Sequence, residues 1–368
     1  MAAMNWDGEP LVTVAVVPRE TLSRTLTTLR SILAAARDDD AAQPFRLLCV
    51  DGGSAPALAD ELARFARTHG ITLLRSEAWL TPNEARNLAW AEARTRYVVF
   101  VDNDVQVGRG WLDALVDAAE RGSAALVGPL YLIGEPGPRT IHMAGGDLRL
   151  IGIDGRRGLH ETHRFGNRPL DEVAHELRAG PTESVEFHVA LVRRDLRDRL
   201  GPLDEGLRSS HEHLDLCLRV QALGEPILFE PASVVTYVPP PPFTGDDRRY
   251  FLMRWCRRWS RDGDARMAGR WGLTDRRWLR ASARWYERHR WMAYGRPPVN
   301  RRARRRGMRA LATLERLAFR ALDRVVEWLV VNPDLRRREA ARALPVQVVC
   351  EGRVLGERAA RRELAVTP

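Results

Sequence analysis

Apolar runs rich in β-branched residues alternate with helical stretches over residues 11–130. Runs at 11–17, 45–51, 71–75 and 97–102 are short and almost continuously apolar, which predicts strands buried on both faces. A stretch with helical spacing follows each of them. This repetition predicts an α/β fold in which helices cover both faces of a largely parallel sheet.

The pattern changes in the second third of the chain. Residues 125–240 contain strand-like runs that helices separate less regularly, with one clear helix at 212–224. Four prolines at 239–242 then stiffen the chain and predict a domain boundary. We therefore expect an α/β domain over 1–240, and a mainly helical extension rich in arginine and tryptophan over 241–368.

Composition narrows the class of protein. The hydrophobic content of 45% permits a real core. The formal net charge is +10, from 58 basic residues, all of them arginine, against 48 acidic residues. The four cysteines are scattered, which disfavours a disulfide scaffold or a structural zinc. The first residues do not resemble a signal peptide, and no stretch approaches about 20 apolar residues without charge. A cytoplasmic protein is expected.

Polar residues follow three of the predicted strands. They are Pro18-Arg19-Glu20, Asp51-Gly52-Gly53-Ser54 and Asp102-Asn103-Asp104. The carboxyl ends of parallel strands share one edge of a sheet, where ligands bind, so the three clusters are expected on one rim. Asp102 and Asp104 reach a single cation only if the chain leaves the sheet near Asn103. A solvated turn is the alternative explanation of this Asp-Asn-Asp sequence.

Four stretches are more specific than any one cluster. VTVAVVPRE, CVDGGS, NEARNLAWAEARTRYVVFVDND and EHLDLCLR resemble, in this order, the motifs of family 2 glycosyltransferases, across residues 11–238. The resemblance implies the A-type glycosyltransferase fold, a Rossmann-like mixed sheet with helices on both faces. It also implies an inverting transfer of a sugar from a nucleotide-diphosphate donor, UDP-linked by resemblance, to an acceptor, with Mn²⁺ or Mg²⁺ as cofactor.

The resemblance also implies roles for individual residues. Pro18 and Glu20 would line the nucleoside, Asp51 would hydrogen-bond the base, and Gly52 would let the backbone approach it. The remaining donor-side residues are Arg86 near the nucleotide, Asp102 on the ribose or a metal-bound water, the adjoining Asn103, and Asp104 as metal ligand, with Asp102 as a second one.

The acceptor side departs from the family pattern in two places. Glu212-His213-Leu214-Asp215 stands where an E-D-x-D motif is usual, so that His213 replaces the aspartate that acts as base. Glu212 and Asp215 remain alternative bases, although Asp215 and Arg219 are also spaced for a helical salt bridge. Tyr237 follows the last strand where many relatives carry histidine, and His188 lies in a segment that relatives use for the acceptor.

The arginine- and tryptophan-rich segment 248–306 has three explanations. Its tryptophans could form the core of a helical extension, lie on an anionic membrane surface, or stack on nucleic acid. We favour the first and disfavour nucleic acid. Other functions remain: an inactive nucleotide-sugar-binding or scaffold protein on the same fold is possible, whereas a nucleotidyltransferase or a Rossmann dehydrogenase would need a glycine-rich phosphate loop that is missing.

Overall fold

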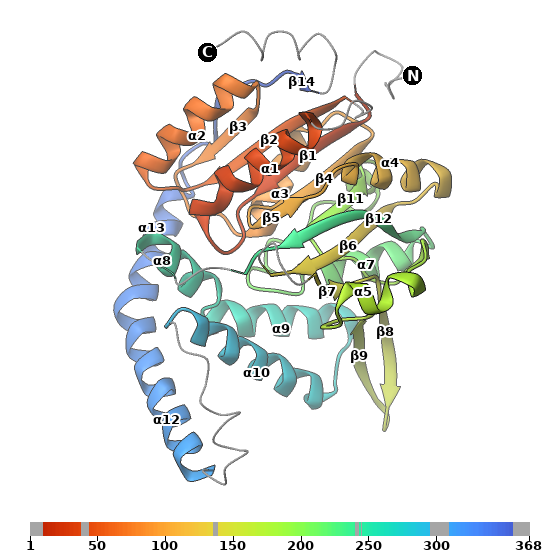
Figure 1. Ribbon diagram of the computed structural model, residues 1–368. Helices are drawn as coiled ribbons and strands as arrows, with labels where there is room; N and C mark the ends of the chain where they lie inside the picture. Colours follow the sequence, from red (N-terminus) through yellow and green to blue (C-terminus); the bar gives the residue numbers. More distant parts are fainter. Residues whose placement is uncertain are drawn as a thin grey trace.

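The computed structural model describes residues 10–37, 44–134, 139–239, 243, 245–294 and 309–355 (Figure 1). The proline run at 239–242, predicted as a boundary, lies outside this part apart from Pro239, as do residues 295–306 of the basic segment. The described residues form an α/β fold with a mixed β-sheet and helices on both faces of the sheet. A mainly helical C-terminal region follows, as the sequence predicted.

The strands form one large sheet and one hairpin. They are β1 Val12–Val17, β2 Phe45–Gly52, β3 Thr72–Ser76, β4 Tyr97–Asp102, β5 Val105–Val107, β6 Leu126–Ile133, β7 Thr140–Met143, β8 Gly146–Ile153, β9 Arg156–His163, β10 Gly180–Pro181, β11 Val189–Arg193, β12 Ile227–Tyr237, β13 Gln347–Cys350 and β14 Val354–Leu355. Only β8 and β9 lie outside the large sheet, where they pair with each other.

The helices alternate with strands in the first half and follow one another in the last third. They are α1 Thr25–Arg37, α2 Pro56–His69, α3 Pro82–Glu92, α4 Trp111–Gly122, α5 Leu170–Val173, α6 Leu196–Leu200, α7 Glu212–Ala222, α8 Gly245–Arg254, α9 Arg257–Trp271, α10 Arg276–Met292, α12 Arg309–Val326 and α13 Asn332–Ala341. Short 3₁₀ turns η1 Leu22–Arg24 and η2 Ala174–Glu176, and the π-helical η3 Glu327–Val331, complete the list.

The order of the main strands explains the shared rim. It runs β10-β12-β6-β11-β4-β1-β2-β3-β13. Strands β3, β2, β1 and β4 are parallel, so three of the polar clusters leave the sheet at the same edge, whereas β11 runs antiparallel between β4 and β6. The Asp102 backbone N–H bonds the His188 carbonyl at 3.0 Å, which brings the segment before β11 to the end of β4.

Two hydrophobic cores sandwich the sheet. On one face, Val14 and Val16 pack with apolar residues of α1, α2 and α4. On the other, Ala15 and Val17 pack with residues of α3 and α7. Successive residues of a strand point to opposite faces, so a strand with a core on each side must be apolar throughout, as β1 is.

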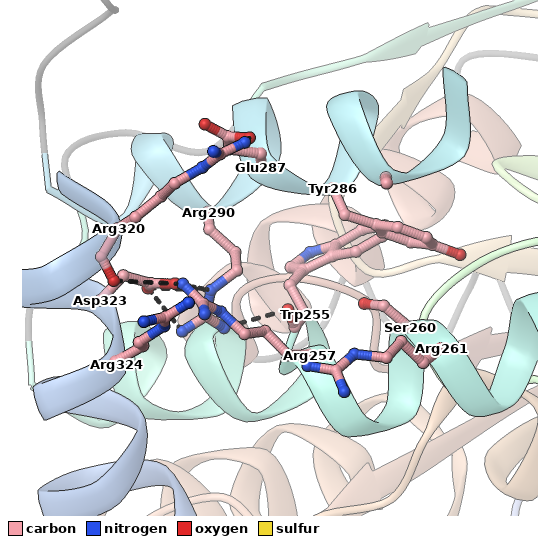
Figure 2. A pocket seen from close by; sticks show the side chains of 11 residues that line it. Trp255, Arg257, Ser260, Arg261, Tyr286, Glu287, Arg290, Arg320, Asp323 and Arg324 are labelled. Carbon is pink, nitrogen blue, oxygen red and sulfur yellow. Dashed lines mark hydrogen bonds and ion pairs between the residues drawn. The ribbon is translucent and has the colours of Figure 1, made fainter. Parts of the chain in front are cut away.

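The C-terminal region has a core of its own, made largely of aromatic residues. Trp255, Trp259 and Trp291 are buried, which confirms for these three residues the interpretation of the tryptophans as core residues of a helical extension. Arg290 and Asp323 lie buried between α10 and α12 with a nitrogen and an oxygen 2.7 Å apart (Figure 2). Arg290 also donates to the carbonyls of Leu252 and Trp255, so this pair joins α8, α10 and α12.

The chain returns to the sheet after these helices. Strand β13 pairs antiparallel with β3, and β14 pairs antiparallel with β2. These two short strands extend the sheet beside β3 and β2 with residues from the last part of the described chain.

Candidate active site

Asp102 ends β4 fully buried among cations. Its carboxylate accepts a hydrogen bond from Arg86 at 2.6 Å and pairs with Arg19 at 3.2 Å. Burial alone would raise the pKa of this carboxyl, but the guanidinium groups of Arg19 and Arg86 outweigh burial and hold the pKa below its usual range. Asp102 is therefore a fixed negative charge, and Arg86 is no solvated helix residue, since it is fully buried over the Phe187 ring.

Asp104 is the buried acid without a partner. Its side chain is 2% exposed, and neither carboxylate oxygen has a hydrogen-bond partner among the described residues. Burial, followed by the nearby charges of Asp102 and Glu20, raises the pKa of Asp104 well above its usual value. Asp102, Asp104 and His188 each offer a ligand atom, and these atoms lie within 4.8 Å of one another. A divalent cation would satisfy the orphaned oxygens and offset the clustered charge.

Asn103, between the two aspartates, hydrogen-bonds backbone groups of the loop after β1. Its side chain accepts from the Arg19 amide at 2.9 Å and donates to the Thr21 carbonyl at 2.6 Å. It therefore fastens the loop after β1 to the end of β4, and β5 then pairs with β12. The chain leaves the sheet between Asp102 and Asp104, as the sequence predicted, and both carboxylates face the same ligand cluster.

The ends of β1 and β2 form the neighbouring part of the rim. One carboxylate oxygen of Asp51 accepts from the Ser54 amide at 2.9 Å, which forms an Asx-type turn, and the other oxygen pairs with Arg75. A Cβ on Gly52 would lie 2.9 Å from Pro18 Cγ. The ends of β1 and β2 can therefore lie this close together because Gly52 has no side chain.

Gly53 allows this turn, and its replacement is expected to weaken the fold. Its φ is +81°, and an added Cβ would lie 2.8 Å from the Ala78 backbone. Gly53→Ala is expected to lower the free energy of unfolding by about 1–3 kcal/mol, because a side chain is overpacked in a left-handed conformation. Gly152→Ala, on β8 with nothing within 4 Å, is the matched control. Equal denaturant midpoints for the two variants would contradict this account.

A buried salt-bridge network links the rim to the C-terminal helices. Arg254 comes from α8. Its Nη1 lies 3.4 Å from Glu20 Oε1, and its Nη2 lies 3.4 Å from Glu212 Oε1. Burial would raise the pKa of Glu212, yet Arg254, with Arg19 and Arg86 behind it, lowers it. The Tyr237 hydroxyl donates to Glu20 at 3.2 Å. Arg254 therefore joins Glu20 and Glu212 in one buried network, a role that no local sequence pattern could have assigned to it.

The three acids and bases at the start of α7 face different surroundings. His213 lines a cavity of about 690 Å³, and its Nε2 lies 3.3 Å from Glu161. Glu212 faces Arg254. Asp215 accepts from Arg270 at 2.6 Å and from the Trp271 indole at 3.1 Å, so both its oxygens bind α9. Of the three, His213 is the one that lines the cavity.

His188 and Tyr237 meet beside the acids. Their rings stack with centroids 4.2 Å apart, and His188 Nδ1 lies 3.4 Å from Asp102. Burial lowers the pKa of His188, which favours the neutral imidazole that a metal requires. Sequence reasoning missed Arg19 and Glu186 as parts of this cluster. Glu186 and His188 are two positions apart in a strand-like sequence, where side chains at that spacing point to the same side. This spacing was the signal in the sequence from which Glu186 could have been found.

The chain is similar in sequence to known glycosyltransferases. Residues 15–176 match the family model described as glycosyl transferase family 2. The pre-mycofactocin glycosyltransferase of Mycobacterium tuberculosis (strain CDC 1551 / Oshkosh) is 29% identical over 233 residues, or 61% of this chain. The match spans 42% of that relative's length.

Solved structures with a similar arrangement include two complexes. One is GalNAc-T7 with UDP, GalNAc and Mn²⁺, at a TM-score of 0.48 and 17% identity over 66% of this chain and 47% of that one. The other is S. aureus TarS 1–349 with UDP-GlcNAc, at a TM-score of 0.43 and 13% identity over 68% of this chain and 70% of that one.

Proposed function

Since residues 15–176 identify a glycosyl transferase family 2 domain, we propose that the protein is an inverting glycosyltransferase that uses a UDP-linked sugar as donor. The observation that carries this proposal is Asp104, whose two buried oxygens lack partners beside Asp102 and His188. A solvated turn would leave such oxygens in water, whereas burial without a partner is costly. The buried triad favours the cation site over the turn.

The donor side is proposed to hold the nucleotide and its cation. Asp102, Asp104 and His188 would ligate Mn²⁺ or Mg²⁺, which supplies positive charge for a diphosphate leaving group. Asp51, Gly52 and Pro18 would contact the nucleoside. Arg19 and Arg86 keep Asp102 ionised and in place.

The acceptor side is proposed to be the cavity next to the α7 N-terminus. His213 would accept the proton of the acceptor hydroxyl while that oxygen attacks the anomeric carbon and the bond to the diphosphate breaks. Its carboxylate neighbour Glu161 would orient the imidazole and stabilise its positive charge. Glu212 and Asp215 are less suited, because arginines already pair with them.

Release of nucleotide separates this enzyme from an inactive fold. Incubation with UDP-glucose, UDP-GlcNAc and UDP-GalNAc, each with Mn²⁺, is expected to release UDP from at least one donor through slow hydrolysis. Binding of UDP without release from any of these sugars would favour the alternative, a nucleotide-sugar-binding scaffold. The absence of both binding and release would contradict the transferase proposal.

We also propose contact with an anionic membrane surface, through a different segment from the buried tryptophans. Helix α12 projects from the body in Figure 1, and its exposed apolar side chains recur at helical spacing into η3: Leu311, Leu314, Leu317, Leu322, Val325, Trp328 and Leu329. Trp328 is 71% exposed. Such a face, on a chain with net charge +10, suits an anionic lipid surface. No described helix is both long and apolar enough to cross a bilayer.

Removing two of these side chains is expected to weaken lipid binding. Leu314→Glu with Trp328→Glu should lower the partition onto vesicles containing phosphatidylserine by about 10-fold or more, because each buried apolar side chain contributes about 1.5–3 kcal/mol. Leu223→Glu, at an exposed leucine on the main domain, is the control. Sedimentation with vesicles measures the partition. Unchanged binding by the double variant, or equal wild-type binding to phosphatidylcholine vesicles, would refute the contact.

A further inference from the structure

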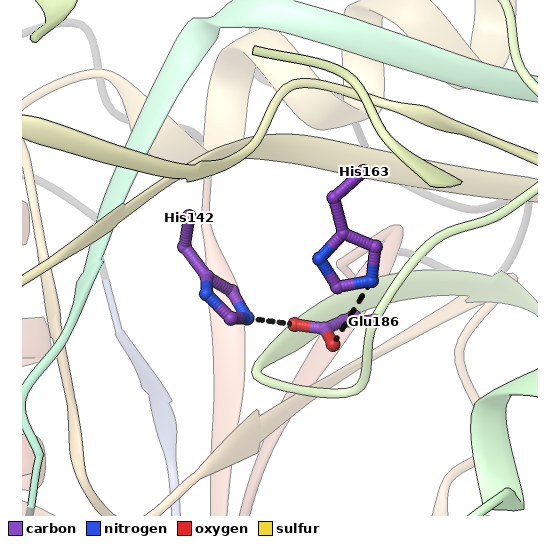
Figure 3. A group of neighbouring side chains, drawn as sticks. All are labelled: His142, His163 and Glu186. Atoms are coloured by element: carbon purple, nitrogen blue, oxygen red, sulfur yellow. Dashed lines mark hydrogen bonds and ion pairs between the residues drawn. The ribbon is translucent and has the colours of Figure 1, made fainter. Parts of the chain in front are cut away.

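A second cluster of metal-binding side chains lines the cavity, separate from the two aspartates. It joins His142 of β7, His163 at the end of β9, and Glu186 from the loop before β11 (Figure 3). His142 Nε2 lies 2.8 Å from one Glu186 oxygen, and His163 Nε2 lies 3.7 Å from the other. Three segments far apart in sequence thus aim two imidazoles at one carboxylate.

The distances suit a metal ion. Zinc bonds its nitrogen and oxygen ligands at about 2.0–2.2 Å, so the ligand atoms of one ion lie at most about 4.4 Å apart. Both measured separations fall within that span. All three side chains are partly exposed and line the cavity, so an ion held by them would keep coordination positions open to it.

We propose that His142, His163 and Glu186 form a second divalent-cation site, which takes a borderline ion such as Zn²⁺. Two imidazoles and one carboxylate are the ligand set of many open zinc sites. The two aspartates of the first site suit harder ions such as Mg²⁺ or Mn²⁺ instead. The chain would therefore hold two cations of different chemistry, one buried with the donor and one on the acceptor cavity.

The surroundings of the cluster are built to hold it in place. The Tyr131 hydroxyl bonds the backbone of Glu186 and donates to the Val189 carbonyl at 2.8 Å, which fixes the loop. Glu161 lies 3.2 Å from His163. Such outer contacts orient the ligands of metal sites. His188 connects the two sites, since its Nε2 lies 3.4 Å from Glu186 and its Nδ1 faces Asp102.

The competing explanation is an ion pair between a protonated His163 and the carboxylates of Glu161 and Glu186. It uses the same side chains but predicts no affinity for a transition metal. Titration with Co²⁺ separates the two, because Co²⁺ substitutes for zinc and absorbs visible light strongly when imidazole and carboxylate ligands hold it in a low-coordinate site. The assay contains no nucleotide, so its outcome is independent of the transferase proposal.

The full-length chain is expected to bind Co²⁺ in a one-to-one visible complex that Zn²⁺ displaces. His142→Ala and His163→Ala should each weaken this complex by about 10- to 100-fold or more, because loss of an outer contact of a metal site already costs that much and a ligand is bound directly. His160→Ala is the matched control, because His160 is an exposed histidine on the same strand as His163. Asp104→Asn should leave the complex intact, since it alters the other site.

Three outcomes would overturn the proposal. They are no saturable visible complex in the wild-type chain, a complex that both histidine variants retain, and a complex that disappears in Asp104→Asn alone. If a histidine variant fails to fold, as judged by circular dichroism, the titration of Asp104→Asn and its displacement by Zn²⁺ still decide the matter, because this variant keeps the second cluster and alters the first.

Discussion

Replacing Asp104 with asparagine is expected to lower the cation-dependent release of UDP from a UDP-sugar by about 10²- to 10³-fold, because a metal contributes several kcal/mol of transition-state stabilisation. The buried oxygens of Asp104 have no partner among the described residues, so the side chain's role is not to hold the fold through a hydrogen bond. The variant should therefore remain folded. The rate of UDP release, measured against Mn²⁺ concentration, tests this.

Two results would contradict the Asp104 prediction. One is full activity of the variant at every Mn²⁺ concentration. The other is an equal loss in Asp117→Asn, which alters an exposed aspartate on α4 and serves as the control. The variant is expected to be at least as stable as the wild type, because the neutral amide removes a buried carboxyl that lies near the charges of Asp102 and Glu20.

Replacing His213 with glutamine is expected to lower kcat for sugar transfer or donor hydrolysis by about 10²- to 10⁴-fold, the usual contribution of a general base. The dissociation constant of UDP should change little, because His213 lines the cavity and is absent from the aspartate cluster. His160→Gln, at an exposed histidine, is the control. Steady-state rates with calorimetric UDP binding measure both quantities.

Glu212 offers the sharpest contrast to this assignment. If Glu212→Gln abolished turnover in a folded protein while His213→Gln retained it, the base would be Glu212. The Arg254 pairing predicts a different effect for Glu212→Gln, a loss of stability, because one charge of a buried network is removed. A thermal melt of the variant distinguishes this loss from a loss of chemistry.

The sequence predicted the rim well because the rim is local. Pro18 directly follows an apolar strand, Asp51 and Asp102 lie at the ends of two others, and parallel strands bring such ends together. It could not predict what surrounds them. Arg254 reaches Glu20 from 234 positions away in the chain, and the partners of Asp215 come from α9. Such contacts depend on tertiary packing, and the periodic pattern of apolar residues does not predict them.

The residues that line the cavity likewise could not be grouped from the sequence. His142 and His188 each lie in strand-like segments, where a satisfied core histidine is the commoner explanation. Their meeting with Glu186 depends on β7 and on the antiparallel strand β11. Helix α12 has apolar residues at helical spacing, but whether its apolar face packs or remains exposed is decided by its neighbours.

The most direct test of the account is calorimetric binding of UDP, with and without Mn²⁺, to the wild-type chain and to Asp104→Asn. GDP and dTDP serve as comparisons for the base. We predict that Mn²⁺ strengthens UDP binding to the wild type by at least about 10-fold, or about 1.4 kcal/mol, and has no such effect on the variant. Two results would contradict the cation site at Asp102 and Asp104. One is a dissociation constant of UDP that Mn²⁺ leaves unchanged in both proteins, and the other is no binding of UDP to either protein.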